Sequence, residues 1–212
     1  MLAHHVERLQ SSGYPVIVAT TTNLTDDPII DAAETLDVEV FRGSEDNVLS
    51  RFAETARVNT VDVIVRVTSD CPLIDGALVR EGVQQFVEAN EPSLYLSNTL
   101  QRSFPRGFDF EVMSADLLFT ADAAAASTHQ REHVTPWLYE SPQTIIRQLV
   151  REDDASDLRV TLDTADDFTL ISRLIEQHDA AQLNVDQIIS TLRAHPELVA
   201  LNAHVEQKKL ED

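Results

Sequence analysis

Apolar residues along the chain follow two spacings, one typical of buried strands and the other typical of amphipathic helices. Short, largely β-branched runs predict strands at 15–20, 38–41, 61–67, 93–97, 108–112, 144–150 and 158–162. Apolar residues three or four positions apart predict helices over 2–10, 26–36, 44–58, 75–89, 114–126, 131–139, 164–178 and 185–194. Strands that alternate with helices indicate βαβ units, so we expect a three-layer α/β/α fold with a mostly parallel, Rossmann-like sheet.

The start of the chain departs from the usual order of such folds. Doubly wound domains normally open on a buried strand, and the loop after it carries phosphate-binding glycines. Here residues 2–10 already predict a helix, and neither GxGxxG nor GxxxxGK[ST] occurs in the 212 residues. Five glycines are present, and no Pro/Gly/Ser-rich linker divides the chain. We therefore expect a single domain over 1–212 whose sheet lacks its first strand, with 179–212 as a helical C-terminal extension.

Composition excludes several classes of protein. The chain is 43% hydrophobic and 25% charged, typical of a globular core, and no apolar run reaches the ~20 residues of a membrane span. The opening sequence MLAHHVERLQ lacks the basic and apolar regions of a signal peptide, and a single cysteine, Cys71, excludes an internal disulfide. These features predict a cytoplasmic protein. A net charge of −20 argues against nucleic-acid partners, which require a basic face.

The basic residues are almost all arginines. Lys208 and Lys209 are the two lysines of the chain. Any phosphate contact made by the body of the protein must therefore come from arginine, backbone N–H groups or a metal ion. The acidic, lysine-poor composition fits either a high-salt cytoplasm, where counterions screen self-repulsion, or an ordinary acidic protein.

Carboxylates follow two predicted strands at the edge where α/β sheets bind ligands. Asp70 comes shortly after VDVIVRV, and Asp163 comes directly after LRVTL. Two carboxylates from neighbouring strand ends can share one Mg²⁺ with phosphate oxygens and water. A structural role for such polar residues is open as well, since the neighbouring Asp75 and Thr164 suit helix N-caps.

Arginines and carboxylates gather in the predicted loop and strand at 97–112. Arg102 and Arg106 lie there beside Asp109 and Glu111, and paired hydrogen bonds from arginine could hold a sugar carboxylate or a phosphate. A solvated loop with surface ion pairs is the alternative.

The histidines and the cysteine carry weaker signals. His133 could donate to a phosphate or orient a metal ligand, although a lone histidine is more often a satisfied structural group. His4 and His5 are expected at the surface. Cys71 is expected to pack, because no partner for nucleophilic catalysis lies near it in sequence. No residue stands out as a general base.

Six segments of the sequence together carry a resemblance to a known family. They are VATTTNLTDDPI (18–29), VFRGSEDNVLSRF (40–52), RVTSDCPLID (66–75), SNTLQRSFPRGFDFEV (97–112), REHVTPWLY (131–139) and LRVTLDTADDF (158–168). In this order they resemble the cytidylyltransferase family typified by the spore coat polysaccharide biosynthesis protein SpsF, which is related to the synthetases that make CMP-activated acylneuraminate and Kdo. The resemblance implies a nucleotide-diphospho-sugar transferase type of fold that transfers CMP from CTP to a sugar or sugar acid with Mg²⁺.

The resemblance also implies roles for individual residues. Asp70 matches the family's metal-binding aspartate, and Asp163 is similar to the second metal aspartate of the related synthetases. Arg131 and His133 match the R-E-H signature and join Asp70 as the expected catalytic residues. The other implied residues are the nucleotide contacts Arg42, Gly43, Ser44 and Arg66 and the substrate contacts Asn98, Arg102, Asp109 and Glu111.

One departure from the family changes the functional expectation. The family begins with a strand and a loop that wraps the CTP phosphates, and LAHHVERL resembles the helix after that loop. We therefore expect the 212-residue chain to be a weak or inactive cytidylyltransferase with a role in surface polysaccharide biosynthesis. An upstream start, a gene remnant, a non-catalytic assembly subunit, and another nucleotidyltransferase or glycosyltransferase of the same fold are open alternatives. The expected partners are CTP and a sugar or sugar acid, a homodimer is open, and neither nucleic acid nor a membrane is expected.

The net charge makes a prediction about salt. Raising KCl from about 0.1 M to about 1 M shortens the screening length from about 10 Å to about 3 Å. Because screening relieves self-repulsion, we expect the melting temperature to rise by at least about 3 °C, or about 1 kcal/mol for a domain of this size. Calorimetry across this range checks the expectation, and a flat melting temperature would refute it.

Overall fold

The structure, a computed structural model, describes residues 1–206 and has the α/β architecture that the sequence predicts. Its helices are α1 (Leu2–Gln10), α2 (Asp27–Thr35), α3 (Val48–Asn59), α4 (Gly76–Ala89), α5 (Ala115–Ala124), α6 (Thr128–His133), α7 (Pro136–Glu140), α8 (Ala165–His178), α9 (Val185–Ala194) and α10 (Pro196–Val199). Its strands are β1 (Ile17–Thr21), β2 (Glu39–Gly43), β3 (Val63–Arg66), β4 (Leu94–Ser97), β5 (Glu111–Ser114) and β6 (Ile145–Gln148). The end of the expected C-terminal extension, residues 207–212, lies outside the described residues. Within residues 1–206, none of the helices has the length and apolar character that crossing a membrane requires.

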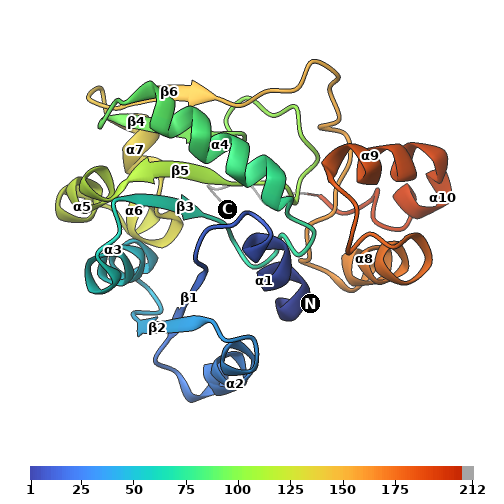
Figure 1. Ribbon diagram of the computed structural model, residues 1–212, viewed down its shortest axis with the longest axis horizontal. Helices are drawn as coiled ribbons and strands as arrows, with labels where there is room; N and C mark the ends of the chain where they lie inside the picture. The colour runs from blue at the N-terminus through green and yellow to red at the C-terminus, as the bar shows by residue number, and fades with distance from the viewer. Residues whose placement is uncertain (207–212) are drawn as a thin grey trace.

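Strands β3, β5, β4 and β6 form a four-stranded sheet in that order (Figure 1). Side chains alternate between its faces, so Leu94 and Leu96 join one core with α4, α8 and α9, while Tyr95 joins another with α3, α5 and α7. Strand β5 runs antiparallel to both of its neighbours, whereas β4 pairs with β6 in parallel. Two cores on opposite faces of the sheet give the three layers that the sequence predicts.

Strands β1 and β2 form a separate parallel pair, which lies beside the larger sheet in Figure 1. In the part of the chain that the structure describes, β1 pairs only with β2, and β3 pairs only with β5. An apolar groove of about 440 Å³ lies between β1 and β3 and is lined by both. The two sheets are therefore separated at the place where the first strand, which the sequence predicts to be lacking, would lie between them.

Two predicted boundaries are wrong for local reasons. The strand predicted at 108–112 begins later, at Glu111, because the Asn98 side chain donates to the Phe108 carbonyl and accepts from the Phe110 N–H. The helix predicted from residue 44 begins at Val48, because Asn47 caps it by accepting from the Ser50 N–H at 3.1 Å. In both places an asparagine side chain binds the backbone in competition with regular structure.

The strand predicted at 158–162 is also wrong. This segment is extended, but it makes one isolated bridge, between Arg106 and Arg159, and does not belong to either sheet. Its backbone bonds to two different loops: the Val160 N–H donates to the Arg106 carbonyl, and the Leu162 N–H donates to the Asp70 carbonyl. Apolar residues at 158, 160 and 162 are therefore fixed by loops, and the strand pattern alone does not distinguish this environment from a sheet.

The helix predicted at 131–139 is two helices, because the chain turns sharply at Val134. Val134 has φ 71° and ψ −56°, and the Thr135 N–H donates to the His133 carbonyl at 2.8 Å. These values define a γ-turn of the rare, strained type with positive φ. Val134 is fully buried, so packing holds a β-branched residue in a backbone conformation that such residues rarely adopt.

His5 is buried, which contradicts its predicted surface position. Its side chain is 4% exposed, and burial lowers its pKa to about 4 even though nearby Asp70 acts in the opposite direction. The reason is that helix α1 packs against the rest of the protein with more of its circumference than the apolar stripe alone. Arg8, on the same helix, donates to the carbonyls of Ile74 and Ala180. Cys71 is buried, as expected.

Gly82 provides a test of the packing beneath the sheet. A methyl group at this α4 position would lie 2.7 Å from Cζ of the Phe110 ring and closer still to Cε2. Alanine normally stabilises a helix interior by about 1 kcal/mol over glycine, but overpacking costs about 1–3 kcal/mol. We therefore expect Gly82→Ala to lower the free energy of unfolding in urea denaturation. Phe110→Leu should restore part of the loss in the double variant, and a stabilised Gly82→Ala would contradict this packing.

Candidate functional site

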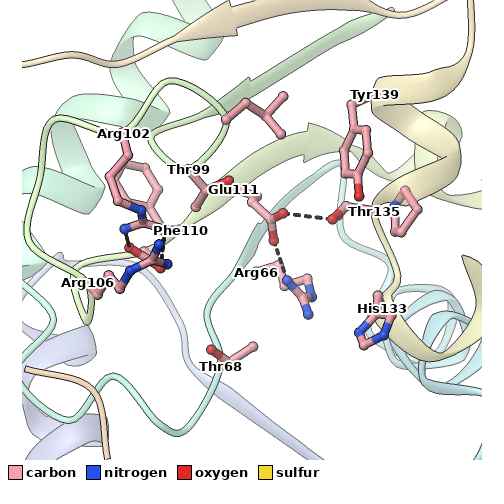
Figure 2. A pocket seen from close by; sticks show the side chains of 13 residues that line it. Arg66, Thr68, Thr99, Arg102, Arg106, Phe110, Glu111, His133, Thr135 and Tyr139 are labelled. Carbon is pink, nitrogen blue, oxygen red and sulfur yellow. Dashed lines mark hydrogen bonds and ion pairs between the residues drawn. The ribbon is translucent and has the colours of Figure 1, made fainter. Parts of the chain in front are cut away.

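A cavity of about 430 Å³ opens beside the four-stranded sheet (Figure 2). Its lining comes from the end of β3, the segment at 99–111, the turn between α6 and α7, and α7 itself. The lining residues are Arg66, Thr68, Thr99, Leu100, Arg102, Arg106, Asp109, Phe110, Glu111, His133, Thr135, Pro136 and Tyr139. Five of the residues that the resemblance implies, from three distant parts of the sequence, therefore meet at one cavity: Arg66, Arg102, Asp109, Glu111 and His133.

The buried carboxylate of Glu111 connects the elements around the cavity. One oxygen accepts hydrogen bonds from the Tyr95 hydroxyl at 2.7 Å and from the Thr135 hydroxyl at 2.8 Å. The other oxygen accepts from the Arg66 guanidinium at 2.5 Å. Because Arg66 ends β3, Tyr95 lies on β4 and Thr135 caps α7, one side chain of β5 holds three other elements in place.

The charge states of this group follow from burial and proximity. Burial acts to lower the pKa of Arg66, but the Glu111 carboxylate outweighs it and the pKa is raised. Burial together with the Glu111 charge raises the pKa of the Tyr95 hydroxyl well above its usual range. Arg66 is therefore a fixed cation and Tyr95 a neutral hydrogen-bond donor near neutral pH.

Two arginines on one wall of the cavity differ in their partners. The Arg102 guanidinium forms a paired contact with the Asp109 carboxylate, at 2.6 Å and 2.9 Å. The backbone of Arg106 is fixed by hydrogen bonds with Leu158 and Val160. Among the described residues, no hydrogen bond or ion pair engages its guanidinium, which lines the cavity. Burial and the neighbouring Arg102 both lower the pKa of Arg106, although it stays charged near neutral pH because arginine titrates far above that range. Arg106 is thus a cation without a protein counterion of its own, facing the cavity.

The opposite wall is built on the strained turn at Val134. The turn sends His133 and Thr135 from the ends of two different helices into the same cavity, which a continuous helix would not do. Burial, with a smaller effect of nearby His129, lowers the pKa of His133, so its ring is neutral near neutral pH. Figure 2 shows His133 and Tyr139 across the cavity from Arg102 and Arg106.

The two aspartates predicted to bind metal lie in neighbouring segments. The Leu162 N–H donates to the Asp70 carbonyl at 2.8 Å. The Asp70 carboxylate accepts from the Thr68 hydroxyl, and the Asp163 carboxylate pairs with Arg159 at 2.6 Å. Within residues 1–206, no group of three or more His, Cys, Asp and Glu side chains is arranged to hold a metal ion. Two oxygen donors fit the half-open kind of Mg²⁺ site, in which phosphates and water supply the remaining ligands, and a shared metal stays a prediction.

The remaining predicted residues lie outside the lining of this cavity. Arg42 and Gly43 end β2, where the Arg42 guanidinium donates to the carbonyls of Thr21 and Asn23 and pairs with Asp27. Ser44 follows them at an exposed position with no regular secondary structure. Two further predicted residues have structural partners, since Asn98 shapes the approach to β5 and Arg131 donates to the Ala125 carbonyl. Binding roles for these five residues stay predictions.

Several lining residues are absent from the predicted set. Thr135 follows a valine and precedes a proline, a pattern that suggests only the start of a helix. Tyr139 and Thr99 carry no sequence signal that separates them from surface hydroxyls. The sequence identifies Arg106 beside Arg102, but it does not predict which of the two arginines forms the ion pair, because this depends on the fold.

The Glu111 network makes a prediction about stability. Glu111→Gln leaves the Arg66 cation buried without its counterion, and such a loss typically costs about 3–5 kcal/mol. We expect a decrease of about 3 kcal/mol in the free energy of unfolding, measured by urea denaturation. The matched change Glu88→Gln, at an exposed position of α4, should stay within about 0.5 kcal/mol of the parent. Equal effects of the two substitutions would show that Glu111 does not hold the cavity together.

Two proteins are similar in sequence to this chain over most of its length. A protein of uncharacterised function from Methanocaldococcus jannaschii is 34% identical over 208 residues, which cover 96% of this chain and 84% of the relative. The spore coat polysaccharide biosynthesis protein SpsF of Bacillus subtilis is 28% identical over 207 residues, which cover 93% of this chain and 83% of the relative.

Solved structures resemble this one across most of its length. A cytidylyltransferase from Leptospira borgpetersenii has a TM-score of 0.89 and 28% identity, with 98% of this chain and 87% of that one covered. The fold is also similar to that of CMP:2-keto-3-deoxy-manno-octonic acid synthetase complexed with CTP, at a TM-score of 0.60 and 15% identity, with coverage of 84% and 88%. The sequence model of the family described as cytidylyltransferase matches residues 1–201. The chain belongs to the cytidylyltransferase family, as its motifs predict.

Proposed function

We propose that this chain transfers CMP from CTP to a sugar acid or a related sugar, in the synthesis of a surface polysaccharide. The observation that carries the proposal is the cavity in which, among residues 1–206, the Arg106 guanidinium has no ion pair of its own, because the nearby Asp109 carboxylate is held by Arg102. A cation held in a partly enclosed site without a partner favours an anionic ligand. A carboxylate on the acceptor sugar fits this requirement and the planar geometry of a guanidinium.

The cavity also has groups suited to the rest of an acceptor. The Tyr139 hydroxyl is available to hydrogen-bond a sugar hydroxyl, and the Thr99 hydroxyl, which shares a hydrogen bond with the Ser97 hydroxyl, can add a second. His133, which lines the cavity and is neutral near pH 7, would accept the proton of the attacking hydroxyl. In this proposal the hydroxyl oxygen bonds to the α-phosphorus of CTP, the bond to the bridging oxygen breaks, and pyrophosphate leaves.

Nucleotide binding is assigned to the side of the site around Asp70. Asp70 and Asp163 would hold Mg²⁺, which when bound supplies positive charge to the phosphates. The Arg42 guanidinium is engaged by Thr21, Asn23 and Asp27, so its predicted nucleotide contact would use backbone groups or require exchange of partners. Gly43 and Ser44, directly after Arg42, are the nearest backbone candidates.

A non-catalytic binding subunit is the second candidate. It is favoured by the absence of a glycine-rich phosphate motif from the 212 residues and by a net charge of −20, which opposes a triphosphate. A protein of this kind would bind a sugar acid without turning over CTP.

Pyrophosphate release distinguishes the two candidates. We expect the 212-residue chain to release pyrophosphate slowly from CTP with Mg²⁺ and a sugar acid, and not from UTP, GTP or ATP. Asp70→Asn should reduce this rate by about 10²-fold, as is typical for loss of one preorganised charged group. The matched control Asp62→Asn, at an exposed position before β3, should leave it unchanged.

The contrary outcomes are equally specific. Binding of a sugar acid without any CTP binding or turnover would favour the non-catalytic subunit. Turnover of another nucleoside triphosphate in preference to CTP would assign a different nucleotidyltransferase activity. Equal rates for Asp70→Asn and Asp62→Asn would remove Asp70 from the mechanism.

A further inference from the structure

The carboxylate of Asp167, in the first turn of α8, is the centre of a second buried network, outside the lining of the cavity. Asp167 is fully buried, and its oxygens accept two hydrogen bonds from the Arg159 guanidinium, both at 3.0 Å. They also accept from the backbone N–H groups of Asp163 and Thr164, at 3.1 Å and 3.0 Å, and from the Asn202 amide at 2.7 Å. The Thr164 contact belongs to the usual capping box of a helix, whereas the other bonds hold groups outside α8.

The segment at 158–163, which this network holds, touches both sides of the proposed site. Its backbone exchanges two hydrogen bonds with the backbone of Arg106, at 3.0 Å and 2.7 Å. Further along the segment, the Leu162 N–H donates to the Asp70 carbonyl at 2.8 Å, and Asp163 is the next residue. One short segment therefore lies against the arginine assigned to the acceptor and carries an aspartate assigned to the metal.

The contact between this segment and the loop at 106–107 is tight. Gly107 has φ 104°, in the region that favours glycine, and a Cβ atom at this position would lie 2.6 Å from the carbonyl carbon of Val160. That carbon is a backbone atom, so it cannot rotate away as the end of a side chain can. The separation of the two backbones is therefore fixed, and any displacement of the segment also displaces Arg106.

Arg159 divides its guanidinium between two carboxylates. Its Nη2 atom donates to Oδ2 of Asp163 at 2.6 Å and also to Asp167, which the Nε atom contacts as well. Within residues 1–206, no hydrogen bond engages the other carboxylate oxygen of Asp163, and this side chain is 43% exposed. The Asp163 carboxylate is thus oriented by Arg159 and still has an oxygen for a metal ion.

The buried contacts of Asp167 have a consequence for position more than for stability. Desolvation of two buried charges opposes their attraction, so a buried ion pair is weak evidence for stability. Hydrogen-bonded groups behind a metal-binding carboxylate, by contrast, set its orientation, and their loss typically costs about 10- to 100-fold in metal affinity. Asp167 lies behind Asp163 in this way, because it holds both the Asp163 N–H and the arginine that orients the Asp163 side chain.

We propose that Asp167 is a positioning residue that fixes the segment at 158–163 and thereby sets both the Asp163 carboxylate and the backbone of Arg106. This role rests on the proposed function, in which Asp163 binds Mg²⁺ and Arg106 binds the acid group of the acceptor. Asp167 does not line the cavity, so it acts through these neighbours. Asn202 supports the same segment from the C-terminal extension, because its amide also donates to the Arg159 carbonyl at 3.3 Å.

Two measurements on the intact chain test the proposal without relying on turnover. The first is the dissociation constant of Mn²⁺ in the presence of CTP, from electron paramagnetic resonance of the free ion. Asp167→Asn removes the charge that holds Arg159, which then turns to Asp163 and must be displaced by the metal. We expect Mn²⁺ to bind about tenfold more weakly to this variant.

The second measurement is amide hydrogen exchange, residue by residue. In Asp167→Asn, exchange at the N–H groups of Arg106, Val160 and Leu162 should accelerate by about tenfold or more, while β4 stays as protected as in the parent. A residue of general stability would accelerate exchange throughout the core instead. The matched control Asp166→Asn removes an exposed carboxylate from the same turn of α8 and should change neither measurement.

A milder variant keeps the proposal testable if Asp167→Asn does not fold. Asn202→Ala removes a neutral donor to Asp167 and leaves no charge without a partner. Because one neutral hydrogen bond contributes modestly, we expect Mn²⁺ binding to weaken by about threefold and exchange to accelerate at the same amides.

The contrary outcomes separate this proposal from the proposed function. Equal Mn²⁺ affinity and equal local exchange in the parent, Asp167→Asn and Asn202→Ala would overturn the positioning role and leave the metal site at Asp163 intact. Uniformly faster exchange with unchanged Mn²⁺ affinity, or equal effects of Asp166→Asn and Asp167→Asn, would also overturn it. Absence of CTP-dependent Mn²⁺ binding to the parent would remove the metal from Asp163, and both the proposed function and the positioning role would fail.

Discussion

The carboxylate of Glu111 is the interaction on which the cavity depends. It is the meeting point of Arg66, Tyr95 and Thr135, and it therefore fixes β3, β4 and α7 relative to β5. A buried ion pair is not in itself a large source of stability, because desolvation opposes the attraction. Its consequence here is positional, since the same contact places the strained turn at Val134 against the sheet and brings His133 into the cavity.

The arrangement of charges follows from the composition of the chain. Carboxylates outnumber cations by 36 to 16, and among residues 1–206 half of the fourteen arginines form an ion pair with an acidic side chain. Arg66 and Arg102 are occupied in this way. Arg106 differs because its neighbour Asp109 is already held by Arg102. In so acidic a protein, a guanidinium left facing a cavity favours a ligand that carries its own negative charge, and this connects the electrostatics to the proposed acceptor.

The sequence predicted the layers of the fold and most of its helices, because hydrophobic periodicity reports which face of an element is covered. It predicted less well where backbone hydrogen bonds go to side chains, as Asn98 and Asn47 show at the starts of β5 and α3. It gave no sign of the γ-turn at Val134, since valine is among the least expected residues at positive φ. The strained residue and the cavity coincide, in agreement with the tendency of strain to persist where a site requires it.

The candidate site was predicted in part for a similar reason. Residues that carry charge and lie in recognisable segments, such as Arg102 and Glu111, were found, and the structure places them at one cavity. Thr135, Tyr139 and the unpaired state of Arg106 could not be found, because they depend on which groups the fold brings together. His5 was missed because the sequence shows one apolar stripe on α1, whereas Arg8 holds that helix against the loops on another side.

The central claim is that Arg106 recognises an acidic acceptor in the cavity held by Glu111. The most direct test is the dissociation constant of a sugar acid, measured by titration calorimetry for the parent, for Arg106→Gln and for Arg147→Gln, an exposed arginine of β6. A hydrogen bond to a charged group contributes about 1.5–3 kcal/mol, so the account predicts about 10- to 100-fold weaker binding for Arg106→Gln. It predicts unchanged binding for Arg147→Gln and no change in CTP affinity for either variant. Equal affinity of the parent and Arg106→Gln for the acid would contradict the account.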